Sequence, residues 1–251
     1  MSGHSKWSTI KRKKGAADAK RGAVFTRLAR EIAVAAREGG GDPDSNFRLR
    51  LAVDKARSEN MPKDNIERAM KRGAGDDKDG VAYEEIMYEG YGPKGVAMMI
   101  ETVTDNRNRS VSEIRHALSK SGGSMAEIGA VSWQFERVAY FAFPSSALDY
   151  DKAFELAIEA GADDVTEDEG MIEITGPVES FKAIADHLHA ANVIPEDAGL
   201  RMAPKQEVEL NVSETLQVLK VIENLEDMDD VQNVYSNLKM SEEAFAALEV
   251  E

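Results

Sequence analysis

The first third of the chain carries apolar residues at the spacing of amphipathic helices. One such segment is predicted to begin at residue 23 and to end at the glycine run 39–41, because glycine suits a helix end better than a helix interior. A second helix is predicted over about 44–58. The apolar faces of these two helices would carry Phe25, Leu28, Ile32 and Ala35, and then Leu49, Ala52, Val53 and Ala56.

A third helix completes this part of the chain. Pro62 suits its first turn, since the N–H that proline lacks would be unpaired there, and Gly73 would end it. Its apolar face would carry Ile66, Ala69 and Met70. Residues 73–80 follow as a polar linker. These features predict a basic arm and a small helical domain over residues 1–79.

After residue 80 the pattern changes to strands that alternate with helices. One β-α-β unit would consist of a strand over 95–104, a helix over 110–121 and a strand over 131–135. A second would consist of a strand over 205–210, a helix capped by Ser213 and a strand over 231–235. Between them, alternating strands and helices are predicted at 138–143, 150–160, 171–175 and 178–190.

This order of elements predicts the α+β fold class. We expect an N-terminal three-helix domain followed by two split β-α-β (ferredoxin-like) domains, one inserted in the other. The discontinuous α+β domain would combine residues 80–136 with 205–251, and the inserted α+β domain would span 137–204. The order of strands within the sheets does not follow from the sequence.

The charge is divided unevenly along the chain. The formal net charge is −15, yet residues 1–75 contain 18 Lys and Arg against 9 Asp and Glu, a net of +9. Residues 76–251 contain 13 against 37, a net of −24. This division indicates an anionic partner for the N-terminal part. The acidic part, with groups such as Asp227, Asp229 and Asp230, would either face a basic protein partner or serve solubility alone.

Basic residues are densest in residues 1–21, which we interpret as an arm. Lysine and arginine side chains near phosphates release condensed counterions, the main source of sequence-independent affinity for nucleic acid. Trp7 could stack on an exposed base or pack on the helical domain. The predicted nucleic-acid contacts are Lys6, Trp7, Lys11, Arg12, Lys13, Lys14, Lys20, Arg21, Arg27, Lys63, Arg107 and Arg109.

The last two of these contacts belong to the segment 105–109, Asp-Asn-Arg-Asn-Arg, near the predicted start of a helix. Two arginines, two amides and a helix N-terminus could hold an anion. The alternative is local: Asp105 and Asn108 would cap the helix while an arginine forms an ion pair. The sequence leaves both alternatives open.

The sequence shows no pattern typical of a catalytic site, a metal site, a cofactor site or a membrane span. The chain has no cysteine, and its 4 histidines show no metal-ligand spacing and no visible Ser/His/Asp grouping, so no catalytic residue, metal or cofactor is predicted. The string at 90–95 matches a dinucleotide-binding pattern. That pattern requires a helix directly after it, whereas the sequence predicts a strand there, so we interpret the string as a turn. No apolar run approaches the roughly 20 residues of a membrane span, and no signal-type segment follows the basic start. We expect a cytoplasmic, non-enzymatic protein. Its oligomeric state does not follow from the sequence.

Several long strings in the first half resemble the YebC/PmpR family. One group is Ser2-Gly-His-Ser-Lys-Trp7, Ile10-Lys-Arg-Lys-Lys14 and Asp18-Ala-Lys-Arg-Gly22. The others are Ala56-Arg-Ser-Glu-Asn-Met-Pro-Lys-Asp-Asn-Ile-Glu-Arg68, Tyr88-Glu-Gly-Tyr-Gly-Pro93 and Thr104-Asp-Asn-Arg-Asn-Arg109. The resemblance implies a three-domain bacterial protein of the cytoplasm, usually described as a DNA-binding transcriptional regulator.

The resemblance also implies an alternative function. Related proteins include a mitochondrial translational activator of cytochrome c oxidase, and the family has been linked to ribosomes stalled on proline-rich sequences. The alternative is therefore a ribosome-associated translation factor that binds rRNA or tRNA. An arm of lysines and arginines gives phosphate affinity without base information, which favours RNA, whereas the usual family description favours DNA.

Overall fold

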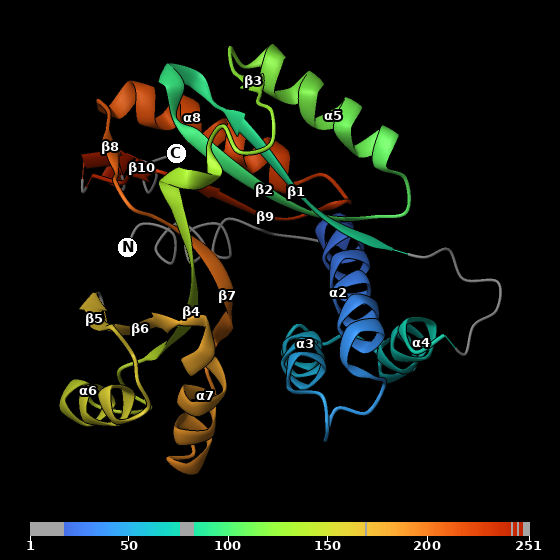
Figure 1. Cartoon of the computed structure of the whole chain (residues 1–251), viewed down its shortest axis with the longest axis vertical. Helices are drawn as coiled ribbons and strands as arrows, with labels where there is room; N and C mark the ends of the chain where they lie inside the picture. Colours follow the sequence, from blue (N-terminus) through green and yellow to red (C-terminus); the bar gives the residue numbers. More distant parts are fainter. Residues whose placement is uncertain (1–17, 76–82, 169, 242, 245, 248–251) are drawn as a thin grey trace. The chain divides into compact units, whose positions relative to one another are not determined.

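The computed structural model describes residues 18–75, 83–168, 170–241, 243–244 and 246–247 (Figure 1). These residues form two compact units. The helix–sheet unit contains the described residues up to Gln134 together with those from Pro204 onward, and the inserted unit is Phe135–Ala203. The chain therefore leaves the helix–sheet unit after Gln134 and returns to it at Pro204.

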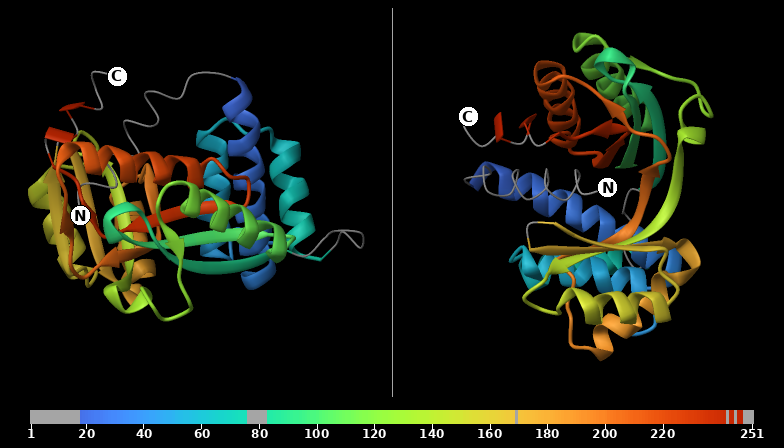
Figure 2. Two further views of the ribbon diagram at one scale, coloured as in Figure 1. Left: turned by 90° about the horizontal axis from the view of Figure 1, so that it is seen from above. Right: turned by 90° about the vertical axis from the view of Figure 1, so that its left-hand side faces the viewer.

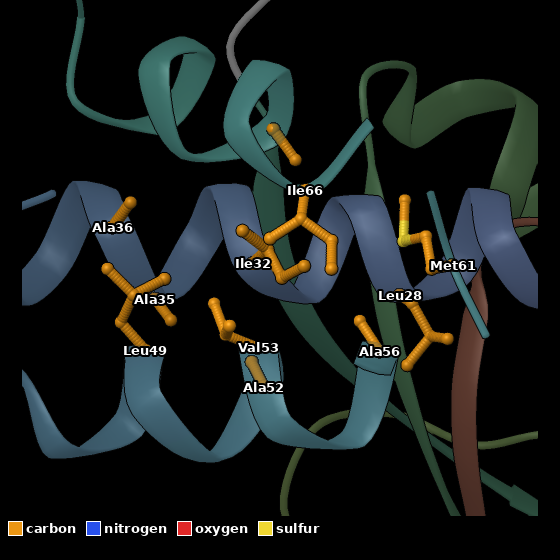
Figure 3. Close-up of a cluster of buried hydrophobic side chains, with 11 residues drawn as sticks. Leu28, Ile32, Ala35, Ala36, Leu49, Ala52, Val53, Ala56, Met61 and Ile66 are labelled. Carbon is orange, nitrogen blue, oxygen red and sulfur yellow. The ribbon is translucent and has the colours of Figure 1, made fainter. Parts of the chain in front are cut away.

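Three helices open the helix–sheet unit: α2 (Asp18–Gly39), α3 (Phe47–Ser58) and α4 (Lys63–Gly73). Both shorter helices pack against α2 (Figure 3). The residues at helical spacing meet there in a buried cluster of Leu28, Ile32, Ala35, Ala36, Leu49, Ala52, Val53, Ala56, Met61, Ile66 and Ala69. α2 begins at Asp18, so the prediction of a helix start at residue 23 is wrong. Alanine, lysine and arginine favour a helix even where no apolar face marks it.

The side chain of Asn46 fixes the link between α2 and α3. Its Nδ2 donates to the carbonyl oxygens of Ala35 and Gly40 at 2.7 and 2.8 Å. Its Oδ1 accepts a hydrogen bond from the N–H of Leu49 at 3.1 Å. One buried amide thus satisfies backbone groups at the end of one helix and the start of the next. For this reason α3 starts at Phe47 and not at residue 44.

The antiparallel sheet of the helix–sheet unit has the strand order β3-β1-β2-β9. Its strands are β1 (Glu84–Tyr91), β2 (Ala97–Thr104), β3 (Ser124–Met125) and β9 (Val231–Ser236). Two helices, α5 (Arg107–Lys120) and α8 (Val212–Glu226), lie side by side on one face of the sheet (Figures 1 and 2). The apolar run of β2 is buried almost throughout, as expected for a central strand.

The hairpin of β1 and β2 contains a strand that the sequence does not predict. Glutamates at 84, 85 and 89 interrupt the apolar residues of β1 and hide its strand pattern. The two strands pair from Glu84 opposite Thr104 to Tyr91 opposite Ala97. The turn between them contains the short 3-10 helix η1 (Pro93–Gly95). The glycine-rich string at 90–95 is therefore a hairpin turn, as predicted.

The predicted strand over 131–135 is wrong. Residues of this segment form the 3-10 helix η2 (Ser132–Gln134), and β4 begins only at Phe135. The reason is the carboxylate of Glu89, which is buried in β1. It accepts hydrogen bonds at 2.8, 2.6 and 3.0 Å from the backbone N–H groups of Gly129, Val131 and Ser132. These N–H groups are paired with a side chain, so they do not join a neighbouring strand.

The segment before α8 also differs from the prediction. The strand expected over 205–210 shrinks to β8 (Val208–Glu209), which pairs in parallel with β10 (Leu238–Lys239) outside the main sheet. α8 is capped by Asn211, whose side chain accepts from the amide three residues later at 3.0 Å. The predicted cap, Ser213, already lies inside the first turn, where its side chain cannot take that role.

The inserted unit contains a second sheet, with the strand order β5-β6-β4-β7. Its strands are β4 (Phe135–Pro144), β5 (Asp164–Asp168), β6 (Met171–Pro177) and β7 (Asp197–Pro204). α6 (Tyr150–Glu159) and α7 (Phe181–Ala190), the latter preceded by η3 (Val178–Ser180), cover one face of this sheet (Figure 2). The sequence does not predict β5, which is mostly acidic and exposed, or β7, whose side chains are mostly only half-buried.

The α+β fold class is confirmed, because three helices are followed by two α+β parts and one of these is inserted in the other. The three helices and the first sheet fall in the same compact unit. A separate helical domain over 1–79 therefore stays a prediction. The same holds for the α+β domain ranges, 80–136 with 205–251 and 137–204.

Candidate nucleic-acid interface

Half of the predicted nucleic-acid contacts lie outside the described residues, namely Lys6, Trp7, Lys11, Arg12, Lys13 and Lys14. Lys20 and Arg21 belong to the first turns of α2, but the description does not extend to their side chains. The four remaining contacts are described in full: Arg27, Lys63, Arg107 and Arg109. Only these four can be placed among their neighbours.

α4 presents basic side chains on the side that faces away from α2. Ile66 and Ala69 are buried, and Gly73 permits a close approach because an added Cβ would lie 2.1 Å from a backbone oxygen of α2. Arg68 and Lys71 are exposed and form no ion pair with any residue in the described part of the chain. Sequence reasoning missed both residues, although their spacing of three on the side opposite the apolar face was a usable signal.

Lys63 lies at the start of α4. Its side chain is 87% exposed, and its Nζ lies 3.6 Å from Oε1 of Glu67, an i,i+4 pair of small energy. Pro62 precedes it and supplies no side-chain acceptor for the first N–H groups of the helix. A helix N-terminus attracts anions, but Asp64 in the first turn of α4 already offsets part of that attraction. A nucleic-acid contact by Lys63 stays a prediction.

The basic side chains of α3 are engaged within the protein. Arg48 forms ion pairs with Glu38 and, at 3.0 Å, with Glu85. Arg57 pairs with Asp54 at 3.0 Å. Exposed pairs like these contribute little stability, but they reduce the positive charge that α3 offers to a ligand. Compared with α3, α4 therefore offers more exposed basic side chains that are outside the ion pairs of the described residues.

The outer side of α2 contacts the loop between α8 and β9. Nη1 of Arg27, a predicted contact, lies 3.5 Å from the carbonyl oxygen of Glu226. Arg30 is 8% exposed and pairs at 2.8 Å with Oδ1 of Asp230. It also donates to the carbonyl oxygen of Asp229. Because both arginines face this loop, a nucleic-acid contact by Arg27 stays a prediction.

Asp230 is a buried carboxylate that joins several elements. Besides the pair with Arg30, it accepts hydrogen bonds from Thr104 at 2.9 Å, from Ser110 at 2.7 Å and from Arg109 at 2.9 and 3.0 Å. Burial alone would raise the pKa of Asp230, but these hydrogen bonds and the charge of Arg30 hold it below its usual value. The exposed acidic group predicted around this residue is therefore wrong for Asp230, which is 3% exposed.

The segment 105–109 is used for helix capping. Asn106 adopts an extended backbone, and its side chain accepts a hydrogen bond from the N–H of Arg109 at 3.1 Å. The predicted caps, Asp105 and Asn108, are therefore wrong. Only the residue directly before the helix places its side-chain oxygen opposite the free amide of the first turn.

The two arginines of this segment differ in their surroundings. Nη2 of Arg109 lies between two carboxylates, 2.8 Å from Asp105 and 2.9 Å from Asp230. The structure thus shows the local alternative for Arg109, an ion pair beside a cap. Arg107 is exposed, and an anion contact by Arg107 stays a prediction.

The described residues were also compared with the requirements of a metal site and of a membrane-spanning helix. No set of three or more His, Asp or Glu side chains within them is placed to hold a metal ion. Of the helices they contain, none combines the length and the apolar character that a membrane crossing requires.

Comparison with known proteins gives matches over nearly the whole chain. Residues 5–76 match the family model described as the TACO1/YebC protein N-terminal domain, and residues 83–238 match the model described as the TACO1/YebC second and third domain. A protein of Geotalea uraniireducens (strain Rf4), named "Probable transcriptional regulatory protein", is 56% identical over 243 residues, which cover 97% of this chain and 98% of the relative.

Two further proteins are similar over comparable lengths. A protein of Geobacter sulfurreducens, whose name begins with the same words, is 52% identical over 248 residues, which cover 99% of this chain and all of the relative. The crystal structure of a conserved hypothetical protein from Aquifex aeolicus has a TM-score of 0.83 to this chain. The two are 42% identical, with 90% of this chain and 93% of that chain covered.

Proposed function

This chain belongs to the TACO1/YebC family, and we propose that it is a nucleic-acid-binding regulatory protein whose basic N-terminal segment contacts phosphates. One observation carries the proposal: residues 1–75 have a net charge of +9, whereas the remainder has −24. Such a segment releases counterions from a phosphate backbone, which gives affinity that depends steeply on salt. The proposal includes no enzymatic activity.

DNA-binding transcriptional regulation is the first candidate. The relatives are named probable transcriptional regulatory proteins. In addition, α3 and α4 are joined by four residues, 59–62, a connection length also found in helix-turn-helix proteins. The second of the two helices carries the exposed Arg68 and Lys71. These side chains would extend the contacts of the arm along the phosphate backbone.

A ribosome-associated translation factor is the second candidate, and the inserted unit favours it. Residues 135–203 contain 15 Asp and Glu against 4 Lys and Arg, a net of −11. Three of those four cations are paired within the unit, in the ion pairs Lys152–Asp149, Lys182–Asp186 and Arg201–Asp197. A bare duplex would repel this surface, whereas an assembly of RNA and basic proteins offers partners for both the basic N-terminal segment and the acidic inserted unit.

α6 shows what such a protein partner would meet. Its outer side carries partly exposed apolar residues at i, i+4 and i+8, namely Tyr150, Phe154 and Ile158. The residue after each of them is an exposed acid: Asp151, Glu155 and Glu159. This alternation of an apolar stripe and an acidic row is complementary to an amphipathic basic segment of a protein.

The test is a titration of the full chain with duplex DNA and with RNA of equal length at several salt concentrations. We expect affinity to fall steeply with salt, and replacing Arg68 and Lys71 by alanine to lower the duplex slope by about 1.8. The matched control replaces Lys55 and Arg57 of the neighbouring α3, which are paired with Glu31 and Asp54. Absence of salt-dependent binding to either polymer would refute the proposal.

Sedimentation separates the two candidates. Cell lysate is run through a sucrose gradient with and without nuclease, and the position of the full chain is followed. A ribosome-associated factor would move with the ribosomes, whereas a DNA-binding regulator would stay out of the ribosome fractions.

A further inference from the structure

We propose that the loop of residues 126–134 is a binding site for an unpaired nucleobase, with Trp133 as the stacking surface and Ile128 as a second apolar contact. The inference rests on the proposed nucleic-acid function. It adds a site in the loop that follows β3 of the helix–sheet unit, far along the chain from the basic segment. It also goes beyond phosphate binding, because stacking recognises a base rather than the backbone.

Two large apolar side chains of this loop are unusually exposed. Ile128 is 89% exposed and Trp133 is 68% exposed. An exposed tryptophan forgoes the stabilisation that burial of so large a side chain would bring. The presence of an exposed tryptophan and an exposed isoleucine in the same short loop indicates a surface that becomes covered by a ligand.

The indole ring is held so that only its faces remain for a ligand. Nε1 of Trp133 donates a hydrogen bond to the carbonyl oxygen of Ala130 at 3.0 Å. The hydroxyl of Tyr91 donates to the same oxygen at 3.2 Å. With its only donor used inside the protein, the ring can still interact through its π faces. Stacking on a base needs nothing more.

The loop itself is fixed before any ligand arrives. Burial would raise the pKa of Glu89, but the N–H groups of Gly129, Val131 and Ser132 hold that pKa below its usual value, so the carboxylate stays charged. Charge-assisted hydrogen bonds of this kind are stronger than neutral ones. A loop held by three of them loses little conformational entropy on binding, which favours a tight complex.

The loop itself carries little charge, and one lysine lies at its end. Glu127 is the only ionisable residue within 126–134. The backbone N–H of Lys205 donates to the carbonyl oxygen of Gln134 at 2.8 Å, which places an exposed lysine at the end of the loop. Lys205 forms no ion pair among the residues that the structure describes, so it is available for the phosphate next to a stacked base.

The test uses tryptophan fluorescence. The chain contains 2 tryptophans, so Trp7→Phe leaves Trp133 as the only one. This variant is titrated with a short, unstructured single-stranded RNA and with the same strand lacking its bases. We expect the RNA, but not the strand without bases, to quench Trp133 on binding.

Affinity provides the second readout. In the same background, Trp133→Leu should weaken binding of the base-containing strand by about fivefold to a hundredfold and leave binding of the strand without bases unchanged. Ile194→Ala, at an exposed apolar residue of the inserted unit, is the control and should change neither affinity. Circular dichroism checks that each variant is folded.

Each outcome has a clear reading. If both strands bind and neither quenching nor the Trp133→Leu effect is seen, the stacking site is refuted and the proposed function stands. If neither strand binds, the proposed function fails and the stacking site fails with it. If Trp133→Leu instead weakens only co-sedimentation with proteins after nuclease treatment, the loop docks a protein and the stacking site is refuted.

Discussion

Replacing Asp230 with asparagine removes one charge from a buried carboxylate that joins several elements of the helix–sheet unit. The parent side chain pairs with the buried Arg30 and accepts hydrogen bonds from two hydroxyls and from Arg109. Asparagine has nearly the same shape, so it leaves no cavity. The guanidinium of Arg30 would nevertheless stay buried without its counter-charge.

The expected loss of stability follows from these contacts. Removing one partner of a buried ion pair destabilises a protein by about 3–5 kcal/mol. The second pair, with Arg109, is partly exposed and adds little to this loss. The amide of asparagine can still bond one hydroxyl, so we expect Asp230→Asn to destabilise the helix–sheet unit by about 3 kcal/mol at neutral pH.

Urea unfolding followed by circular dichroism measures this loss. Asp229→Asn is the matched control, because it makes the same change one position away on an exposed side chain and keeps the backbone carbonyl that Arg30 uses. We expect the control to change stability by less than about 0.5 kcal/mol. Equal effects of the two substitutions would refute the structural role of Asp230.

The pH dependence gives an independent check. Because the pKa of Asp230 is lowered in the folded protein, its charge stabilises the fold above the unfolded-state pKa of about 3.9. That stabilisation is lost as pH falls through the folded-state pKa. The difference between parent and Asp230→Asn should therefore be full at neutral pH and shrink below about pH 4. A difference that stays constant down to pH 2 would contradict this reasoning.

Three further predictions concern other parts of the molecule. Asn46→Ala should destabilise the helices by about 1–2 kcal/mol in the same urea assay, because the cap of α3 and two backbone contacts are lost together; no loss would show that water replaces the amide. Glu89→Gln puts an N–H₂ where a backbone donor needs an acceptor, so hydrogen exchange of the loop amides should accelerate while that of β2 does not. Neutralising Glu155 and Glu159 together should slow association with a basic ribosomal fraction and weaken its salt dependence. The matched control neutralises two carboxylates on β5, Glu167 and Asp168, and equal behaviour of both variants would indicate that the charge serves solubility.

Helical periodicity gave the most reliable predictions from the sequence. Of the eleven apolar residues predicted to lie on the faces of the first three helices, nine belong to one buried cluster, and Phe25 and Met70 pack against it partly buried. Strands were harder to predict. β1 contains three glutamates, and its alternation of buried and exposed residues becomes clear only once Glu89 is known to be buried and hydrogen-bonded. A carboxylate looks like a surface residue until its partners are known.

In the candidate site, too, local features could be predicted from the sequence, whereas contacts between distant residues could not. The density of basic residues in the arm is a local property and needs no structure. The role of Asp230 depends on Thr104, 126 positions away along the chain, and no pattern in the sequence predicts such a contact. Trp133 was overlooked because its segment was interpreted as a strand, in which an exposed aromatic residue would have no special meaning.

The most direct test of the central claim is the salt dependence of nucleic-acid binding by the basic arm. The parent chain is compared with a variant in which alanine replaces Lys11, Arg12, Lys13 and Lys14. With about four phosphate contacts removed, the slope of log affinity against log salt on duplex DNA should fall by about 3.6, most of the affinity should be lost, and circular dichroism should show an intact fold. A folded variant with unchanged slope and unchanged affinity would contradict the claim that this arm makes the contact.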